Sequence, residues 1–393
     1  MAQTPPTLKQ RIRSVSLIFA CGTALFSDGY SNGVISAVLN RIYGADRIEN
    51  HNYGTIVRSL TFAGTVVGMI IFGWLSDKVG RKFGMMSATG IVALFAGLSA
   101  ASSGAHGSLG GMLAMLSAMR KDSMKNARIP YLLILKRYWV SLLAISFTWF
   151  LYDFIVYPFG LYSSIIIDRR LLMEIGSITG GSDSLTVVLG WNTVIKLSCK
   201  LSIGTLIGAF ILDYLGPKYT MITGLVLQAI VGFIMSGLYE KLANHIAGFA
   251  VVYGIFLSFG EVGPGNCLGL LASKSSPTAV RGQFYGAAAA VGKVGAFVGT
   301  WAFPPMISAF GGPDTTKGNT GPFWVGSGLA ILSAIIVILF IRPLTHDGMV
   351  EEDAAFRRYL EEHGYDTSSM GLVESTTSTT VETDEKLGSF EKV

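Results

Sequence analysis

The chain has 393 residues, of which 50% are hydrophobic and only 14% are charged. Soluble domains carry about 25% charged residues, so the composition excludes an ordinary soluble globule and indicates several membrane-spanning segments. The formal net charge of +5 is unevenly divided, because residues 1–342 carry +13 and residues 343–393 carry −8. Positive charge in an apolar chain marks cytoplasmic loops, so it gives no support to nucleic-acid binding.

Nine apolar runs are long enough to cross a bilayer core, which takes about 20 helical residues. Backbone polar groups in lipid must bond within the segment, so each run is predicted to be a helix. Closely spaced small residues in many of them favour tight helix packing. The runs are residues 15–39, 55–75, 84–101, 139–167, 185–212, 219–238, 246–271, 284–310 and 323–341.

Lysine and arginine predict the orientation of these spans. The N-terminal tail and the links after the second, fifth, seventh and ninth runs carry basic residues, which places them in the cytoplasm. The stretch 120–137, with six basic residues and one acid, belongs on the same side. The acidic C-terminal tail is then cytosolic as well.

The alternation fails between the third run and the basic stretch 120–137. The third run should end outside the cell, so an odd number of crossings is needed before residue 120. The chain offers only 109–119 there, and eleven helical residues reach about 16 Å, half of what a crossing requires. We therefore expect transmembrane segments to be missing at this point.

A repeated motif gives the same result. "DKVGRK" at 77–82 is echoed by "DYLGPK" at 213–218, with Gly three residues and Lys five residues after Asp in both copies. The first copy follows the second run and the second copy follows the fifth, whereas two equal halves would place it after the eighth. Three spans are therefore predicted to be absent.

The first copy packs charge into a short cytoplasmic turn between two apolar runs. Asp77 can cap the following helix or pair with a basic residue elsewhere, Gly80 permits a tight turn and Gly73 permits close helix packing. Charge that only sets topology is the alternative. The pattern G-x-x-x-D-K-x-G-R-K resembles the signature loop of the major facilitator superfamily, which implies two six-helix halves, alternating access and a gating latch. The latch residues are Gly73, Asp77, Lys78, Gly80, Arg81 and Lys82, with Asp213, Gly216 and Lys218 in the second copy.

Further stretches narrow the resemblance. "FSDGYSNGVI" in the first run and "WFLYDFIVYPFGLYSS" in the fourth are similar to proton-coupled phosphate symporters. "GEVGPGNCLGLLASKSSPTAVRGQFYGAAAAVGKVGAFVGT" is most similar to fungal glycerophosphoinositol permeases within that branch. The resemblance covers residues 15–119 and 121–342, and the counterparts of the family's fourth, fifth and sixth spans are missing.

The expected fold is an all-α membrane protein, a major facilitator superfamily bundle truncated to about nine full transmembrane helices plus a stub. Residues 1–119 form an incomplete N-terminal half with three spans and the stub, and 120–137 a basic cytoplasmic link. Residues 138–342 form a six-helix C-terminal half. Residues 343–393 form an acidic, Ser/Thr-rich cytoplasmic tail, expected to be disordered apart from a short helix near "EEDAAFRRYLEEHG".

Charged groups inside spans are costly and are therefore functional candidates. Asp28 and Asp153 lie in mid-span, where burial favours the neutral carboxyl group and suits a proton carrier; hydrogen bonding to neighbouring hydroxyls is the structural alternative. By resemblance, Trp149, Asp153 and Tyr157 match a seventh-span set that lines a phosphate pocket. Their i, i+4, i+8 spacing places them on one helical face.

Two further groups complete the predicted substrate site. Lys293 matches an eleventh-span lysine of the family, and its ammonium can pair with a phosphate or a carboxylate; snorkelling to the interface is the alternative. Glu261 and Asn266 flank "VGPG", where Pro264 and Gly265 should interrupt helical bonding. Glu261 stands where phosphate symporters use an amide, so it could accept hydroxyls of inositol or glycerol.

The predicted function is secondary active transport, namely proton-coupled uptake of glycerophosphoinositol or a related glycerophosphodiester through the plasma membrane. Two alternatives stay open: a non-transporting truncated remnant of such a permease, and an inorganic phosphate:proton symporter. The expected partners are the substrate, protons and the lipid bilayer, with no nucleic acid. No nucleotide loop, nucleophile elbow or metal cluster is found in the sequence, so no enzyme activity, cofactor or metal is expected.

Overall fold

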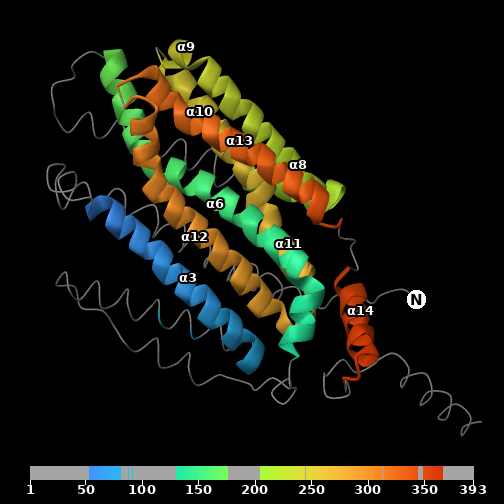
Figure 1. Ribbon diagram of the computed structural model, residues 1–393. Coiled ribbons are helices and arrows are strands. Elements are labelled where there is room, and N and C mark those ends of the chain that lie inside the picture. Colours follow the sequence, from blue (N-terminus) through green and yellow to red (C-terminus); the bar gives the residue numbers. More distant parts are fainter. Residues whose placement is uncertain are drawn as a thin grey trace, which may run out of the picture. The chain divides into compact units, whose positions relative to one another are not determined.

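The computed structural model describes residues 53–80, 87, 91, 130–175, 204–243, 245–312, 314–343 and 348–365. These residues are helical apart from short turns and bends, and they include no strand (Figure 1). Within them, six stretches are long and apolar enough to cross a membrane. The elements are α3 (Tyr53–Val79), α6 (Tyr131–Ile175), α8 (Thr205–Gly237), α9 (Tyr239–Ala243), α10 (Ile246–Gly260), the π-helix η2 (Glu261–Gly265), α11 (Asn266–Lys274), the 3-10 turn η3 (Thr278–Val280), α12 (Arg281–Ala309), α13 (Thr316–Phe340) and α14 (Gly348–Glu362).

Most predicted spans have a helical counterpart, although their bounds differ. The run 139–167 lies inside the 45-residue helix α6, which extends eight residues further at each end. The run 246–271 is a continuous helical stretch whose middle is the π-helix η2. The run 15–39, with Asp28, lies outside the described residues, as do Arg81, Lys82, most of 84–101 and the stretch 109–129.

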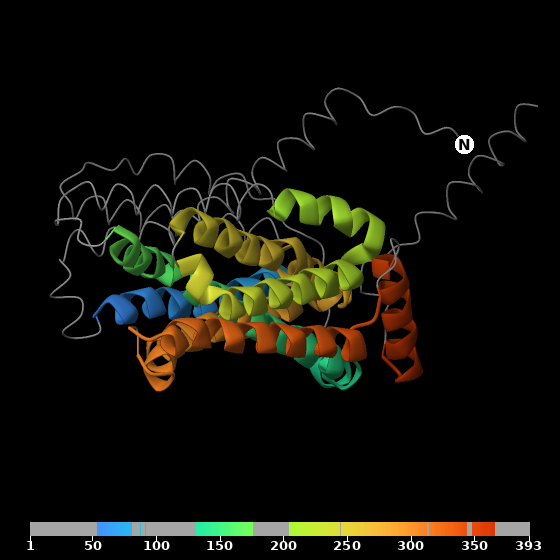
Figure 2. The same cartoon turned by 90° about the horizontal axis from the view of Figure 1, so that it is seen from above.

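Helix α8 contains the turn that the repeated motif predicts. Gly216 has φ 73° and ψ 167° inside α8, followed by Pro217, and Figure 2 shows the chain doubling back there. Gly80, its counterpart in the first copy, has φ 120°. Both values lie in the region that L side chains rarely adopt, so both glycines are required for the turn. The two motif copies therefore have a glycine of positive φ at the corresponding position.

The described residues group into two units. The first consists of the described parts of Met1–Val67, Ala144–Leu268 and Ala289–Ile341. In it α8 lies against α10, η2 and α13 (Figure 1). The backbones of α8 and η2 nearly touch, because a Cβ added to Gly224 would lie 2.5 Å from the Cα of Gly263. Small residues thus allow the close helix approach expected in a membrane bundle.

The second unit consists of the described parts of Gly68–Leu143, Gly269–Ala288 and Arg342–Val393. Helix α14 belongs to this unit and packs against its other segments. The side chains of Phe356 and Leu360 are buried. Asp353 accepts hydrogen bonds from the backbone N–H (2.6 Å) and hydroxyl (2.5 Å) of Thr278, and lies 3.9 Å from the Arg281 guanidinium. The acidic tail predicted from the sequence therefore includes a helix that packs onto the transmembrane body.

A second set of contacts joins α14 to the start of α6. The Tyr138 phenol donates a short hydrogen bond to the Glu352 carboxylate, and the Arg137 guanidinium lies 3.6 Å from the same carboxylate. Arg137 also lies over the ring of Tyr359, 5.0 Å from its centroid. The charged face of α14 thus contacts two segments that are far apart in the sequence.

We expect Asp353→Ala to lower the free energy of unfolding by about 2–3 kcal/mol, because it removes two hydrogen bonds to a charged group, each worth about 1.5–3 kcal/mol when buried, and partial exposure of the carboxylate weakens both. Thermal unfolding of the purified protein in detergent measures the change. Glu362→Ala, at the exposed end of the same helix, is the control and should be neutral. Equal melting temperatures for both variants would show that α14 contributes nothing through Asp353.

Candidate functional site

The first unit contains a buried ion pair between α6 and α12. Lys293 Nζ lies 3.2 Å from Asp153 Oδ2, and their side chains are 12% and 1% exposed. The flanking sequence on both helices is apolar or made of small residues, so few other charges compete for this pair. The structure thus brings together the two charged groups that the sequence singled out in the fourth and eighth runs.

The predicted face of α6 is the face that meets α12. Lys293 also donates a short hydrogen bond to the Tyr157 hydroxyl and lies 4.1 Å from the centroid of that ring. Trp149 lies one turn before Asp153 on α6 and packs against Gly292 of α12. A Cβ added to Gly292 would lie 2.4 Å from the Cδ1 atom of Trp149. Trp149, Asp153 and Tyr157 therefore all contact α12, as their spacing predicted.

Glycines on α12 set the distance between the two helices. A Cβ on Gly295 would lie 2.2 Å from the Phe150 carbonyl oxygen, and one on Gly299 would lie 2.5 Å from the Phe154 carbonyl oxygen. The Phe154 carbonyl lacks its usual helical donor, because Pro158 has no N–H. The chain therefore needs small residues on α12 to hold Lys293 within reach of Asp153.

Tyr157 also packs against an aromatic ring of α3. The ring of Phe62, on α3, meets it edge-on with centroids 4.9 Å apart and an interplanar angle of 82°. Phe62 is 2% exposed. An aromatic pair of this geometry stabilises by about 0.5–1.5 kcal/mol beyond burial, so the orientation of the phenol beside Lys293 is well defined.

A second polar group lies on η2. Glu261 begins the π-helix, and its carboxylate hydrogen-bonds the phenol of Tyr152, which is 7% exposed. Tyr152 directly precedes Asp153 on α6, so Glu261 lies near the charged pair in the first unit. π-Helical turns are frequent at functional sites. The predicted interruption at Pro264 and Gly265 is this π-helix.

Asn266, another predicted substrate residue, contacts the start of α8. Its amide donates a 3.1 Å hydrogen bond to the Thr205 carbonyl at the start of α8. A Cβ on Gly208 would lie 2.2 Å from its Nδ2 atom, so the amide is packed against α8. The described contacts of Asn266 therefore hold the chain next to α8.

The described residues of the predicted gating loop include Asp77 and Gly73, whose contacts lie in the second unit. Asp77 accepts hydrogen bonds from the backbone N–H groups of Gly282 (2.9 Å) and Gln283 (2.6 Å) in the first turn of α12. A carboxylate at a helix N-terminus satisfies unpaired N–H groups and favours the helix dipole. A Cβ on Gly73 would lie 2.7 Å from the Gly282 carbonyl oxygen, which explains why glycine is needed there. The sequence left open a cap on the following helix or a basic partner, and the hydrogen bonds found here cap a different helix, α12.

The remaining loop residues differ in their surroundings. Lys78 and Asp213 are exposed. Lys218 donates a 3.0 Å hydrogen bond to the Ile338 carbonyl near the end of α13. The second motif copy therefore anchors the end of a helix in the first unit.

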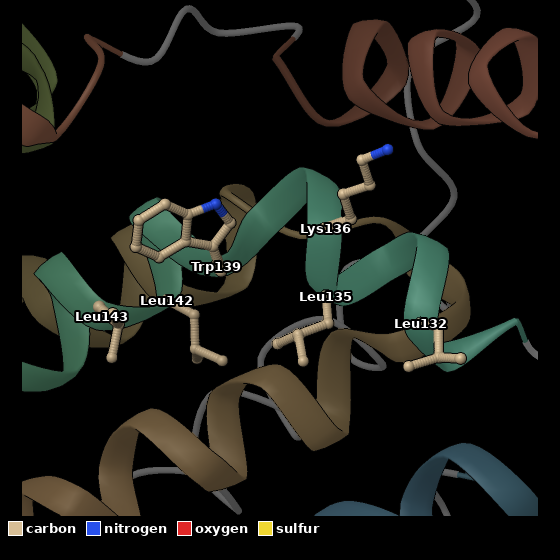
Figure 3. A pocket seen from close by; sticks show the side chains of 6 residues that line it. All are labelled: Leu132, Leu135, Lys136, Trp139, Leu142 and Leu143. Carbon is tan, nitrogen blue, oxygen red and sulfur yellow. The ribbon is translucent and has the colours of Figure 1, made fainter.

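An apolar hollow beside α6 is a different feature from the charged pair. It has a volume of about 420 Å³, and its described lining residues all lie on α6 (Figure 3). Figure 3 shows four leucines on one side of the helix, with Lys136 and Trp139 directed elsewhere. Most of its lining is apolar, so it offers a phosphate few polar partners. Its lining residues are Leu132, Leu135, Lys136, Trp139, Leu142 and Leu143.

Sequence reasoning missed Tyr152, Phe62 and Gln228. Tyr152 is adjacent to Asp153 but off the predicted face, so periodicity could not indicate it. Gln228 is fully buried, and neither of its amide atoms has a hydrogen-bond partner among the described residues. A polar residue within the apolar run "LVLQAIVG" was the available signal for it.

The helices and the buried charges define a multi-pass membrane protein built as an α-helical bundle. The sequence model of the family described as sugar (and other) transporter matches residues 15–121 and 175–352. The chain therefore belongs to this family of the major facilitator superfamily, and it is a membrane transporter rather than an enzyme. The predicted all-α facilitator fold and multi-pass membrane location are confirmed.

Characterised relatives point to a narrower group. A glycerophosphocholine permease of Candida albicans is 32% identical, with 97% of this chain and 88% of the relative aligned. A glycerophosphodiester transporter of the same yeast is 33% identical over 98% and 89%, and its major glycerophosphoinositol permease is 33% identical over 90% and 83%. The first alignment runs over 482 residues whereas this chain has 393, so at least 89 aligned positions have no counterpart here.

Proposed function

We propose that this protein is a proton-coupled symporter for glycerophosphoinositol or a related glycerophosphodiester in the plasma membrane. The observation that carries the proposal is the buried Asp153–Lys293 pair, with an ion separation of 3.2 Å. A buried pair keeps its charges only while each has its partner. A group that replaces one partner therefore changes the protonation of the other, which is how binding and proton uptake can be linked.

The proposed cycle uses these groups in order. The phosphodiester anion takes the place of Asp153 beside Lys293, with Tyr157 and Trp149 lining the same face. Asp153, left buried without a cation, then takes up a proton. Asp28, which lies outside the described residues, is proposed as a second proton-binding carboxylate, and Glu261 accepts substrate hydroxyls.

The signature loop is proposed as the latch of one access state. Asp77 stabilises the start of α12, the helix that carries Lys293. Breaking these two hydrogen bonds would free that end of α12. The motif copy at 213–218 is proposed to act in the same way at the end of α13 through Lys218.

A second candidate function is a membrane remnant that does not transport. Two observations favour it. The relatives have at least 89 aligned positions that this chain lacks, which is about the length of three spans with their connections. The family match also breaks after residue 121, next to the short stretch 109–119. This reading keeps the C-terminal half and removes the fourth, fifth and sixth spans of the family.

Uptake by the reconstituted chain tests the proposal. We expect proteoliposomes to accumulate labelled glycerophosphoinositol under an inward proton gradient, and a protonophore to abolish the accumulation. Inorganic phosphate should compete weakly, since Glu261 adds negative charge to the site; strong competition and phosphate uptake would favour the phosphate symporter. Absence of uptake, together with uptake by a variant given three spans from a relative, would favour the remnant.

A further inference from the structure

We infer that Tyr152 is a positioning residue that, through Glu261, makes the site select phosphodiesters over inorganic phosphate. The inference rests on the proposed function and adds the basis of its selectivity. Tyr152 matched no predicted motif, yet it connects the two polar groups of the first unit. Its hydroxyl and the Glu261 carboxylate meet beside Gly265, and on α6 it directly precedes Asp153.

The geometry fixes the phenol against the π-helix. A Cβ on Gly265 would lie 2.6 Å from Glu261 Oε2 and 3.0 Å from the Tyr152 hydroxyl oxygen, so both groups converge where this residue has no side chain. A Cβ on Gly260 would lie 3.5 Å from Tyr152 Cε2. Gly260 lies just before η2 and Gly265 ends it. The two glycines therefore leave room for the Tyr152 ring and for the Glu261 carboxylate.

The chemistry of this pair suits a diester. An ionised carboxylate only accepts hydrogen bonds, and its two oxygens offer about four lone-pair sites. The Tyr152 hydroxyl uses one, and a carboxylate can accept further hydrogen bonds from hydroxyl groups of glycerol or inositol. The hydrogen bond also fixes the direction of the carboxylate. Without it, the side chain would have to lose rotational freedom when the substrate binds, at a cost in free energy.

The same carboxylate works against inorganic phosphate. A phosphodiester carries a single negative charge, whereas inorganic phosphate carries up to two near neutral pH. Lys293 is the cation of the pair, and Asp153 and Glu261 both contribute negative charge when ionised. These carboxylates therefore repel a second negative charge on the ligand, and the repulsion is strong because the site has a low dielectric constant. Tyr152, by holding Glu261, keeps that discrimination in place.

The test is the ratio of glycerophosphoinositol and inorganic phosphate affinities in Tyr152→Phe. Removing the hydroxyl should reduce the discrimination about tenfold or more, as expected for a lost hydrogen bond to a charged group. The KM for glycerophosphoinositol should rise while the maximal rate stays close to that of the parent chain. In Glu261→Gln, adding Tyr152→Phe should change the ratio little further, because the two residues act as one unit.

Tyr253→Phe is the matched control. It also removes a phenol from a fully buried tyrosine of the first unit, where the hydroxyl donates a 2.6 Å hydrogen bond to the Phe159 carbonyl. It should leave the ratio unchanged. Competition binding to purified protein in detergent gives the same ratio without transport.

The outcomes separate this inference from the proposed function. If the parent chain binds neither ligand, the proposed function fails and the inference fails with it. If the parent chain binds glycerophosphoinositol but Tyr152→Phe keeps its discrimination, or loses no more than Tyr253→Phe, the inference alone is overturned. Additive effects of Tyr152→Phe and Glu261→Gln would also overturn it.

Discussion

Lys293→Gln is expected to lower the free energy of unfolding by about 3–5 kcal/mol and to abolish substrate uptake. The loss of stability follows because Asp153, 1% exposed, would have no cation beside it and would have to bind a proton or stay charged without a partner, and removal of one partner of a buried pair costs this much. The loss of uptake follows because the phosphate would have no ammonium to bind. Thermal unfolding and uptake on the same preparation measure both effects.

The double variant Asp153→Asn/Lys293→Gln separates structure from transport. Replacing both charges by neutral groups of similar size removes the unpaired charge, so the stability should return close to that of the parent chain. Uptake should stay absent, because both groups of the proposed cycle are gone. Uptake by the double variant would mean that the pair only stabilises the fold.

Gly295→Ala is expected to lower the stability by about 1–3 kcal/mol, as overpacking of a well-packed site does, and to reduce uptake more than tenfold. The new Cβ would lie 2.2 Å from the Phe150 carbonyl oxygen, so α12 must move away from α6. That movement lengthens the Asp153–Lys293 separation. Expression yield, melting temperature and uptake are the measurements.

Gly328→Ala is the matched control for this substitution. Gly328 lies in α13, and a Cβ there would meet nothing within 4 Å. Alanine is favoured over glycine in a helix by about 0.5–1 kcal/mol, so this variant should be as stable as the parent chain or slightly more stable. A similar loss in both variants would contradict the role assigned to the glycines of α12.

The sequence predicted what depends on composition and periodicity. The apolar runs indicated helices, and the i, i+4, i+8 spacing indicated that Trp149, Asp153 and Tyr157 share a face. Both predictions agree with the structure. Gly80 and Gly216, chosen because a tight turn needs them, both have positive φ.

Other features depend on contacts between distant segments, which periodicity does not report. The partner of Asp77 is a pair of backbone N–H groups at the start of α12, so no side-chain pattern could identify it. The packing of α14 depends on Asp353 and Thr278, which are 75 residues apart. Tyr152 and Glu261 meet beside Gly265, the last residue of the π-helix, and Pro264 alone did not specify that geometry.

The most direct test of the central claim is the number of protons taken up when glycerophosphoinositol binds. Calorimetric titration of the purified chain in two buffers of different ionisation enthalpy gives this number. The proposed cycle predicts about one proton per substrate in the parent chain, the same in the exposed control Asp213→Asn, and close to none in Asp153→Asn. Equal proton uptake in the parent chain and Asp153→Asn would contradict the assignment of Asp153 as the group that couples substrate to proton.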